Sequence, residues 1–188
     1  MTTLSTLQVG MAAPDIRVQT VDDTAISLSQ VWQEQPILLF FLRHFGCALC
    51  RSHLHSIRDS YDEFRARGTE VIAMTLADTR GAAQFAHQNR LPFRVFADPL
   101  RNSYRAFTLA EGTLNDALGL DVLARQVTQA LRGNMPYMTS MGSSIKQLGG
   151  SFIVDQRGTV QFAHFAIPIY NYPTIAQYLS VIDQLEAS

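Results

Sequence analysis

Two cysteines, Cys47 and Cys50, are the residues whose type and spacing point most directly to chemistry. They are separated by two residues, in the order Cys47-Ala48-Leu49-Cys50, and are the 2 cysteines of a chain of 188 residues. Two cysteines cannot form the framework of several disulfides found in small secreted proteins. A Cys-x-x-Cys pair can instead alternate between a dithiol and a disulfide. One thiolate attacks the substrate, and the second cysteine then attacks the first sulfur to form the disulfide. The pair therefore predicts thiol-dependent redox chemistry.

The position of each cysteine predicts its role. The apolar run Pro36–Leu42 precedes the pair, and an amphipathic helical pattern begins at Ala48, so Cys47 is expected at a helix N-terminus. The positive end of a helix favours a thiolate over a thiol. We therefore expect Cys47 to be the more exposed and more acidic sulfur, and the attacking nucleophile. Cys50 lies about 300° further round the helix, one turn inward, and is expected to be the resolving thiol.

Three side chains next to the pair are candidates for a supporting role. Arg43 and Arg51 are cations close to the cysteines in sequence, and either can stabilise a thiolate. Arg51 can equally be a solvated charge on the helix. His44 follows the apolar strand, where it can carry a proton or be an ordinary loop histidine. The strand itself carries no carboxylate, so it offers no buried acid to take the proton from Cys50.

Two other interpretations of the cysteine pair stay open. The residues with the spacing of a Cys₂His₂ metal site are Cys47, Cys50, His53 and His55. His53 and His55 are about 200° apart on a helix, however, and cannot converge on one ion. His44 and His164 can still meet the cysteines in space and complete a metal site, such as one for copper. The pair can also be two buried, unreactive side chains. We expect neither a metal nor another cofactor.

The elements that position the pair follow from the hydrophobic pattern. The expected extended segments are a loop entering a strand in Gln8–Thr20, then Ala25–Gln30, Pro36–Leu42, Glu70–Leu76 and Phe93–Ala97, and a late hairpin of Ser151–Val154 and Thr159–Phe165. The expected helices are Ala48–Arg67, ending at Gly68, then Arg80–Arg90, Pro99–Phe107, Asn115–Arg132 and Ile175–Leu185. Alternating strands and helices predict a parallel sheet, to which the hairpin adds an antiparallel part.

A Cys-x-x-Cys pair between the first central strand and its helix is typical of a thioredoxin-like fold. We therefore predict an α/β protein with a central mixed sheet flanked by helices. It carries an N-terminal extension and a helical insertion, within about residues 109–148, before the final hairpin. The Met-containing stretch Arg132–Lys146 of this insertion is expected to be a loop, a lid or an interface.

Composition limits the class of protein. A chain of 188 residues predicts one domain, residues 1–188, and 47% apolar with 16% charged residues is the mix of an ordinary globular protein. A net charge of −1 argues against a nucleic-acid or anionic-membrane partner. The longest apolar run is far shorter than the roughly 20 residues that span a bilayer. Met1–Gly10 has neither a charged nor an apolar signal region, so we expect a cytoplasmic protein.

Three segments resemble one family. Val9-Gly10-Met11-Ala12-Ala13-Pro14-Asp15, followed by Ala25-Ile26-Ser27-Leu28-Ser29, resembles the opening of the alkyl hydroperoxide reductase/thiol-specific antioxidant (AhpC/TSA) group, the peroxiredoxins and their relatives. Arg43-His44-Phe45-Gly46-Cys47-Ala48-Leu49-Cys50-Arg51 is similar to the R-x-x-G-C-x-x-C-R motif of its peroxiredoxin-like, selenoprotein-U-like branch. The segment from Gln147 to Asp155 resembles the same branch before its late hairpin.

The resemblance implies a peroxiredoxin-like antioxidant enzyme with Cys47 as nucleophile and Cys50 as resolving thiol. Its electrons would come from a thioredoxin-like protein or a small thiol, and its substrate would be a peroxide or a disulfide. The resemblance is also compatible with an oligomer. Two alternatives are a thiol–disulfide oxidoreductase acting on protein disulfides, and a non-catalytic metal-binding or redox-sensing module.

The sequence departs from the family pattern at three positions. Phe40 and His44 stand where typical peroxiredoxins have a proline and a threonine. Gly149 stands where they have an arginine, and where thioredoxins have a cis-proline. In those peroxiredoxins the residues at these positions orient the peroxide, so the departures predict slow peroxide reduction by a dithiol that still exchanges readily with disulfides.

Overall fold

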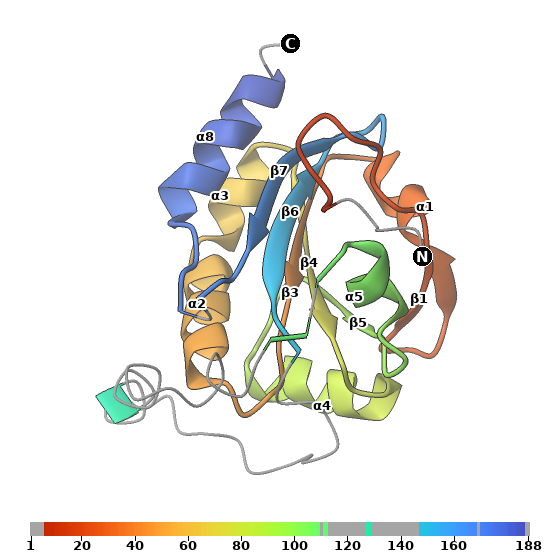
Figure 1. Ribbon diagram of the computed structural model, residues 1–188, viewed down its shortest axis with the longest axis vertical. Coiled ribbons are helices and arrows are strands. Elements are labelled where there is room, and N and C mark those ends of the chain that lie inside the picture. The colour runs from red at the N-terminus through yellow and green to blue at the C-terminus, as the bar shows by residue number, and fades with distance from the viewer. Residues whose placement is uncertain (1–5, 110, 113–126, 129–146, 169, 187–188) are drawn as a thin grey trace.

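A computed structural model of the protein describes residues 6–109, 111–112, 127–128, 147–168 and 170–186. Its centre is a 7-stranded mixed sheet in the order β2-β1-β5-β4-β3-β6-β7 (Figure 1). The strands are β1 (Arg17–Thr20), β2 (Ala25–Ser27), β3 (Ile37–Phe41), β4 (Glu70–Thr75), β5 (Arg94–Ala97), β6 (Gly150–Val154) and β7 (Val160–Phe165). The helices are α1 (Leu28–Trp32), α2 (Ala48–Asp59), α3 (Tyr61–Ala66), α4 (Thr79–Gln88), α5 (Asn102–Ala106) and α8 (Ile175–Glu186).

The sheet has a parallel and an antiparallel part, as the sequence predicted. Strands β3, β4 and β5 are parallel neighbours. Strand β6 pairs antiparallel with β3 and forms a hairpin with β7. The β3–α2 junction therefore lies beside the start of β6, because Phe41 at the end of β3 pairs with Gly150.

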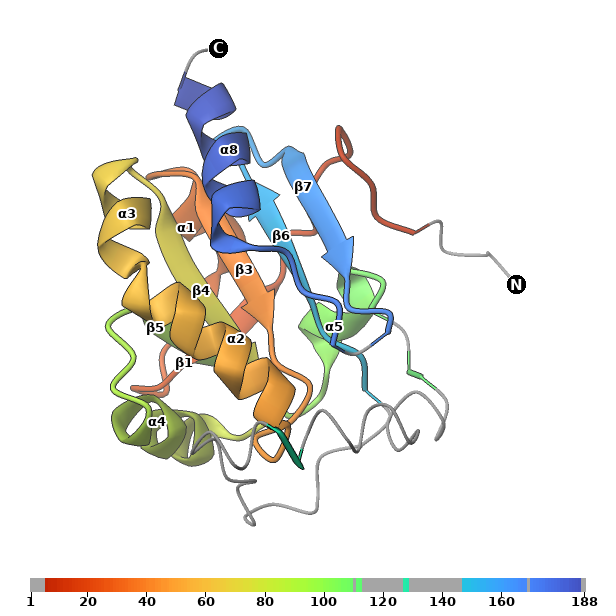
Figure 2. The ribbon, with the colours of Figure 1, turned by 90° about the vertical axis from the view of Figure 1, so that its left-hand side faces the viewer.

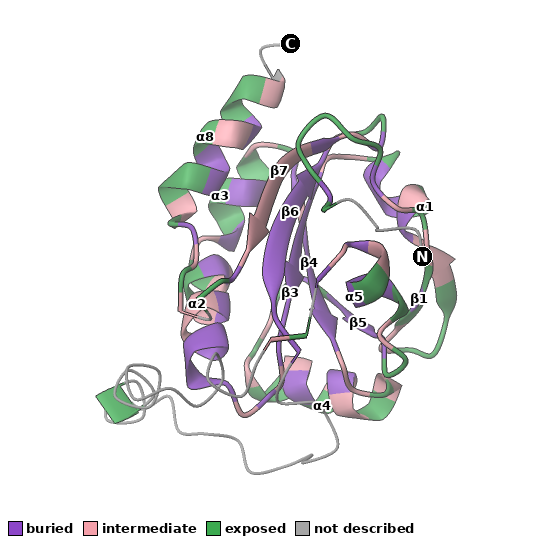
Figure 3. Ribbon diagram, viewed as in Figure 1, coloured by how far each residue is buried: buried purple, intermediate pink, exposed green. Residues whose placement is uncertain are grey.

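Helices cover both faces of the central strands. Leu38 and Phe40 of β3 face a core shared with α2, α3, α4 and α8, whereas Ile37, Leu39 and Phe41 face a second core shared with α1 and α5. Figure 2 shows α2, α3 and α8 on the near side of the sheet and α1 and α5 behind it. All five residues of β3 are buried, and Figure 3 shows the same for most of the central strands. This explains the uninterrupted apolar run, because neither face of the strand meets water.

The helix predicted over Ala48–Arg67 is interrupted in the structure. It ends at Asp59, and a second helix begins after Ser60, which has φ −104° and ψ 13°. Asp62 and Glu63 lie in the first turn of this second helix, where their negative charge is favourable. The apolar spacing continues across the break and conceals it in the sequence. Gly68, with φ +59°, ends α3 where the sequence predicted a helix end.

The extended segment predicted over Ala25–Gln30 is also shorter than expected. Strand β2 ends at Ser27, and α1 begins at Leu28. The Ser27 amide donates a hydrogen bond to Oε1 of Gln30 at 2.9 Å, a contact typical of a helix start. Apolar periodicity over six residues could not distinguish the end of a strand from the start of a helix.

The helix predicted over Asn115–Arg132, most of the predicted insertion and the Arg132–Lys146 stretch lie outside the described residues. Among the helices that the structure describes, none has the length and apolar character needed to cross a bilayer.

Candidate active site

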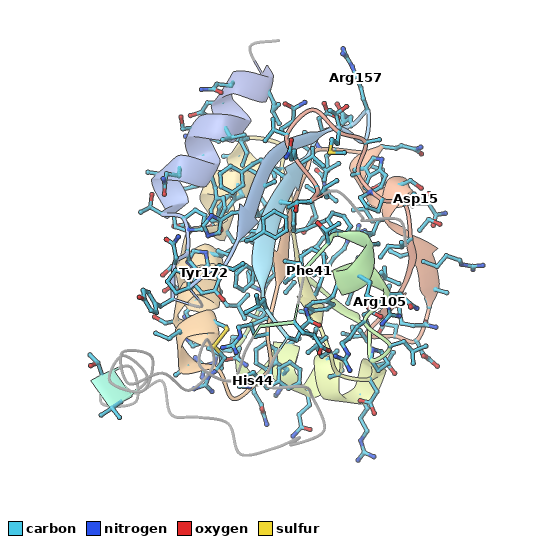
Figure 4. All side chains as sticks on the ribbon, in the orientation of Figure 1. Asp15, Phe41, His44, Arg105, Arg157 and Tyr172 are labelled. Carbon is cyan, nitrogen blue, oxygen red and sulfur yellow. A yellow bond between two sulfur atoms is a disulfide. The ribbon has the colours of Figure 1, made fainter. Side chains whose placement is uncertain are left out.

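The two cysteines lie at the junction of β3 and α2. Cys47 is the N-cap residue of α2, and its Sγ accepts a hydrogen bond from the Cys50 amide at 3.2 Å. A disulfide joins Cys47 to Cys50, whose Cα atoms are 5.3 Å apart. Figure 4 shows it as a yellow bond beside the start of α2, with Tyr172 and His44 labelled on either side. The cap geometry directs a backbone N–H at Cys47 Sγ, which is the arrangement that stabilises a thiolate there.

The prediction that Cys47 is the more exposed sulfur is wrong for the disulfide form. Both cysteines are 0% exposed. The segment that enters α2 is itself buried, with Leu42 at 1% and Arg43 at 1% exposed, so the helix N-terminus faces protein rather than water. A position at a helix N-terminus fixes the electrostatics of a residue but not its access to solvent.

Arg43 brings a positive charge to Cys47. Its Nη1 lies 3.9 Å from Cys47 Sγ, and its Nε donates a hydrogen bond to the Gln147 carbonyl at 3.0 Å. Gln147 is itself buried and donates through Nε2 to the Leu109 carbonyl at 3.1 Å. A chain segment far away in sequence therefore holds the guanidinium against the nucleophilic candidate.

His44 and Arg51, the other two supporting candidates, differ from Arg43. Burial, reinforced by the positive Arg43, lowers the pKa of His44 to about 4. His44 is therefore neutral at pH 7 and adds no positive charge beside Cys47. Arg51 is buried in the first turn of α2, where its amide donates to the Cys47 carbonyl at 3.1 Å, and desolvation lowers its pKa.

Tyr172, which the sequence analysis did not identify, contacts the second sulfur. Its hydroxyl donates a hydrogen bond to Cys50 Sγ at 3.3 Å. Its ring stacks on His53 with centroids 4.7 Å apart and packs at a tilt on Phe40 at 5.7 Å. Tyr172 is 122 residues from Cys50, in the segment between β7 and α8, and belongs to no recognised motif.

The histidines considered as metal ligands have separate partners. Nε2 of His53 hydrogen-bonds with the Tyr178 hydroxyl at 3.1 Å, whereas Nε2 of His55 hydrogen-bonds with Asn89 Oδ1 at 3.0 Å. His164 hydrogen-bonds through Nε2 with the Asn171 carbonyl at 2.7 Å. In the part of the chain that the structure describes, no three His, Cys, Asp or Glu side chains form a group that could hold a metal ion.

Gly149 lies where two chain segments approach closely. A Cβ atom at this position would lie 2.6 Å from the Phe41 carbonyl oxygen, 3.3 Å from Arg43 Cγ and 3.5 Å from the Tyr172 hydroxyl. Glycine therefore allows the segment before β6 to reach the end of β3, next to the groups that contact the two sulfurs. The position where the family pattern has an arginine or a proline is occupied by backbone alone.

We expect Gly149→Ala to destabilise the fold, because the added methyl group meets a backbone oxygen that cannot rotate away. Overpacking of this kind typically costs about 1–3 kcal/mol. The free energy of unfolding, measured in urea on the oxidised protein, gives the cost. An unchanged unfolding midpoint would show that the two segments separate without penalty.

Comparisons with known proteins agree with this architecture. The chain is 24% identical over 155 residues to a prostamide/prostaglandin F synthase of Salmo salar, a match that covers 79% of this chain and 74% of that protein. It is 30% identical over 89 residues to the chloroplastic peroxiredoxin Q of Oryza sativa subsp. japonica, over 47% of this chain and 41% of that protein. A chloroplastic thioredoxin-like protein of Arabidopsis thaliana is 28% identical over 97 residues, over 52% of this chain and 39% of that protein. The chain thus spans less than half the length of the last two relatives.

Solved structures show the same fold. The crystal structure of peroxidoxin BcpB from Mycobacterium tuberculosis superposes with a TM-score of 0.68, at 16% identity, over 96% of this chain and 97% of that chain. The predicted thioredoxin-like fold is thereby confirmed. The AhpC/TSA family model matches residues 9–163, which include the N-terminal segment, the cysteine pair and most of the late hairpin. The chain belongs to the AhpC/TSA family.

Proposed function

We propose that the protein is a peroxiredoxin-like, thiol-dependent oxidoreductase in which Cys47 is the nucleophile and Cys50 the resolving thiol. The observation that carries the proposal is the disulfide at the N-cap of α2 with Arg43 beside Cys47 Sγ. The backbone N–H and the guanidinium both favour a thiolate at Cys47. Membership of the AhpC/TSA family supports the same reaction class.

The reaction we propose begins with the reduced pair. The Cys47 thiolate attacks one oxygen of a peroxide ROOH, the O–O bond breaks, and Cys47 becomes a sulfenic acid while ROH leaves with a proton taken from solvent. The Cys50 thiolate then attacks the sulfenic sulfur, which forms the disulfide and releases hydroxide that becomes water. Two electrons from a thioredoxin-like protein or a small thiol restore the dithiol. Such donors are available in a reducing compartment, and we place the protein in the cytoplasm.

We expect this protein to reduce peroxide more slowly than typical peroxiredoxins do. Phe40 and Gly149 carry no hydrogen-bonding side chain, and His44, which is neutral at pH 7, adds no positive charge there. Loss of a preorganised donor to a developing charge typically costs about 10²–10³ in rate. Stopped-flow oxidation of the reduced protein by hydrogen peroxide measures it. A rate constant near the diffusional ceiling of roughly 10⁸ M⁻¹s⁻¹ would show that Arg43 and the helix N-terminus supply all the stabilisation that is needed.

A second candidate function is thiol–disulfide exchange with proteins. It is favoured by the short ring closed by Cys47 and Cys50, which forms while α2 keeps its regular first turn. Reduction of insulin disulfides and consumption of peroxide, assayed side by side with the same thiol donor, separate the two reactions. Turnover with neither substrate would contradict both and favour the non-catalytic sensor.

A further inference from the structure

The hydrogen bond from Tyr172 to Cys50 gives the second sulfur a partner of its own. Cys47 Sγ has the Cys50 amide and Arg43, whereas Cys50 Sγ accepts from the Tyr172 hydroxyl at 3.3 Å. Cys50 is 0% exposed, so water does not solvate its sulfur. A buried thiolate without a donor carries a large desolvation cost. The Tyr172 hydroxyl is placed to offset that cost.

The surroundings keep this hydroxyl protonated and in place. Burial raises the pKa of the Tyr172 phenol well above its usual range, although the charge of Arg43 acts in the opposite direction. The phenol therefore remains a donor at neutral pH. Its ring is held by the stack on His53 and by Phe40. A side chain on Gly149 would approach the hydroxyl, and none is present there.

The charged and titratable groups around the phenol do not take over its role. Burial, reinforced by His164, lowers the pKa of His53 to about 4, so this ring is neutral at pH 7. The Tyr178 hydroxyl donates to Ser151 Oγ at 2.8 Å and contacts His53 instead of a cysteine. The charge of Arg43 acts on the phenol, but its guanidinium lies against Cys47.

We propose that the Tyr172 hydroxyl stabilises the Cys50 thiolate each time the disulfide opens and each time it forms. The inference rests on the proposed function. In reduction, the donor thiolate attacks Cys47 Sγ, a donor–Cys47 disulfide forms, and the Cys47–Cys50 bond breaks with its electron pair on Cys50 Sγ. The phenol donates a hydrogen bond to this thiolate and keeps its own proton. In oxidation, the same thiolate attacks the Cys47 sulfenic acid and displaces hydroxide.

The test measures the pKa of the Cys50 thiol in a Cys47→Ser chain. The pKa is obtained from the pH dependence of Cys50 alkylation by iodoacetamide. Tyr172→Phe retains the ring that packs on His53 and removes only the hydroxyl. A hydrogen bond to a charged group is worth a factor of about ten or more, so Tyr172→Phe is expected to raise the pKa of the Cys50 thiol by about one pH unit or more. In the chain with both cysteines, disulfide closure after a single peroxide oxidation is expected to slow by about tenfold at pH 7.

Tyr178→Phe is the matched control. It also removes a buried hydroxyl from the same core, one that hydrogen-bonds with Ser151 and His53 rather than with a sulfur. We expect it to lower thermal stability without changing the pKa of Cys50. A Cys50 pKa that is the same in parent and Tyr172→Phe would overturn the inference. Because alkylation needs no substrate, that result differs from failure of the unaltered protein to cycle its disulfide, which would overturn the proposed function instead.

Discussion

Replacing Cys47 with serine is expected to abolish turnover with peroxides and disulfides alike, whereas Cys50→Ser stops the cycle after one step. A serine hydroxyl at Cys47 is not ionised at neutral pH, so the arginine and helix N-terminus that favour a thiolate have no nucleophile to act on. In Cys50→Ser, Cys47 still attacks but no second sulfur closes the ring. A sulfenic acid or a mixed disulfide therefore accumulates on Cys47.

Mass spectrometry after dimedone trapping, together with steady-state assays, measures both expectations. Cys47→Ser should give no dimedone adduct at Cys50 and no consumption of peroxide. Cys50→Ser should give a stoichiometric adduct at Cys47. Full activity of Cys47→Ser with every substrate tried would show that the assigned nucleophile is wrong.

The sequence predicted the parts of this site that depend on neighbouring residues. The apolar run up to Leu42 specifies a strand buried on both faces, and the pattern after Ala48 specifies a helix, so the place of the cysteine pair between them followed directly. The capping contact of Cys47 Sγ with the Cys50 amide is equally local. A few residues of pattern are sufficient to predict these features, because the same hydrogen bonds form wherever a strand leads into a helix.

The features that sequence reasoning missed depend on distant segments. The Tyr172 contact joins residues 122 positions apart, and the bond from Arg43 to the Gln147 carbonyl joins residues 104 positions apart. Cys47 is buried beside Arg43, which turns inward against the segment before β6. Periodicity carries no information about such pairs. The pairing of β6 with β3 places the segment before β6 beside the β3–α2 junction.

That pairing also explains why a charge that is costly to bury persists beside Cys47. Arg43 is 1% exposed, and an isolated guanidinium at such a position would be unfavourable. The Gln147 carbonyl compensates for part of this cost in the disulfide form, in which Cys47 carries no charge. When the disulfide is reduced, the guanidinium acquires a thiolate as an oppositely charged neighbour. Arg43 thus stabilises the reduced state more than the oxidised state.

Arg43→Met is accordingly expected to have the largest effect of any substitution outside the two cysteines. Methionine retains an unbranched apolar stem and removes the charge. Loss of an adjacent positive charge raises the pKa of an acidic group such as a thiol by about one to three pH units. The Cys47 thiolate fraction at pH 7, and with it the rate of reaction with peroxide or iodoacetamide, should fall by about 10-fold to 10³-fold.

The pH profile of Cys47 alkylation in the Cys50→Ser chain distinguishes this effect from simple damage to the fold. Because the thiol becomes less acidic, the Arg43→Met profile should move to higher pH and meet that of the parent once both thiols are fully ionised. Arg43→Lys, which retains a charge, should move the profile to higher pH by less than Arg43→Met does. Arg105→Ala, which removes an exposed arginine of α5, should leave the profile where it is in the parent. A positive charge next to Cys47 changes the fraction of the thiol that is ionised, and it can no longer do so once the thiol is fully ionised. An alkylation rate that is lowered equally at every pH would therefore mean that Arg43 only supports the packing of the segment between β3 and α2.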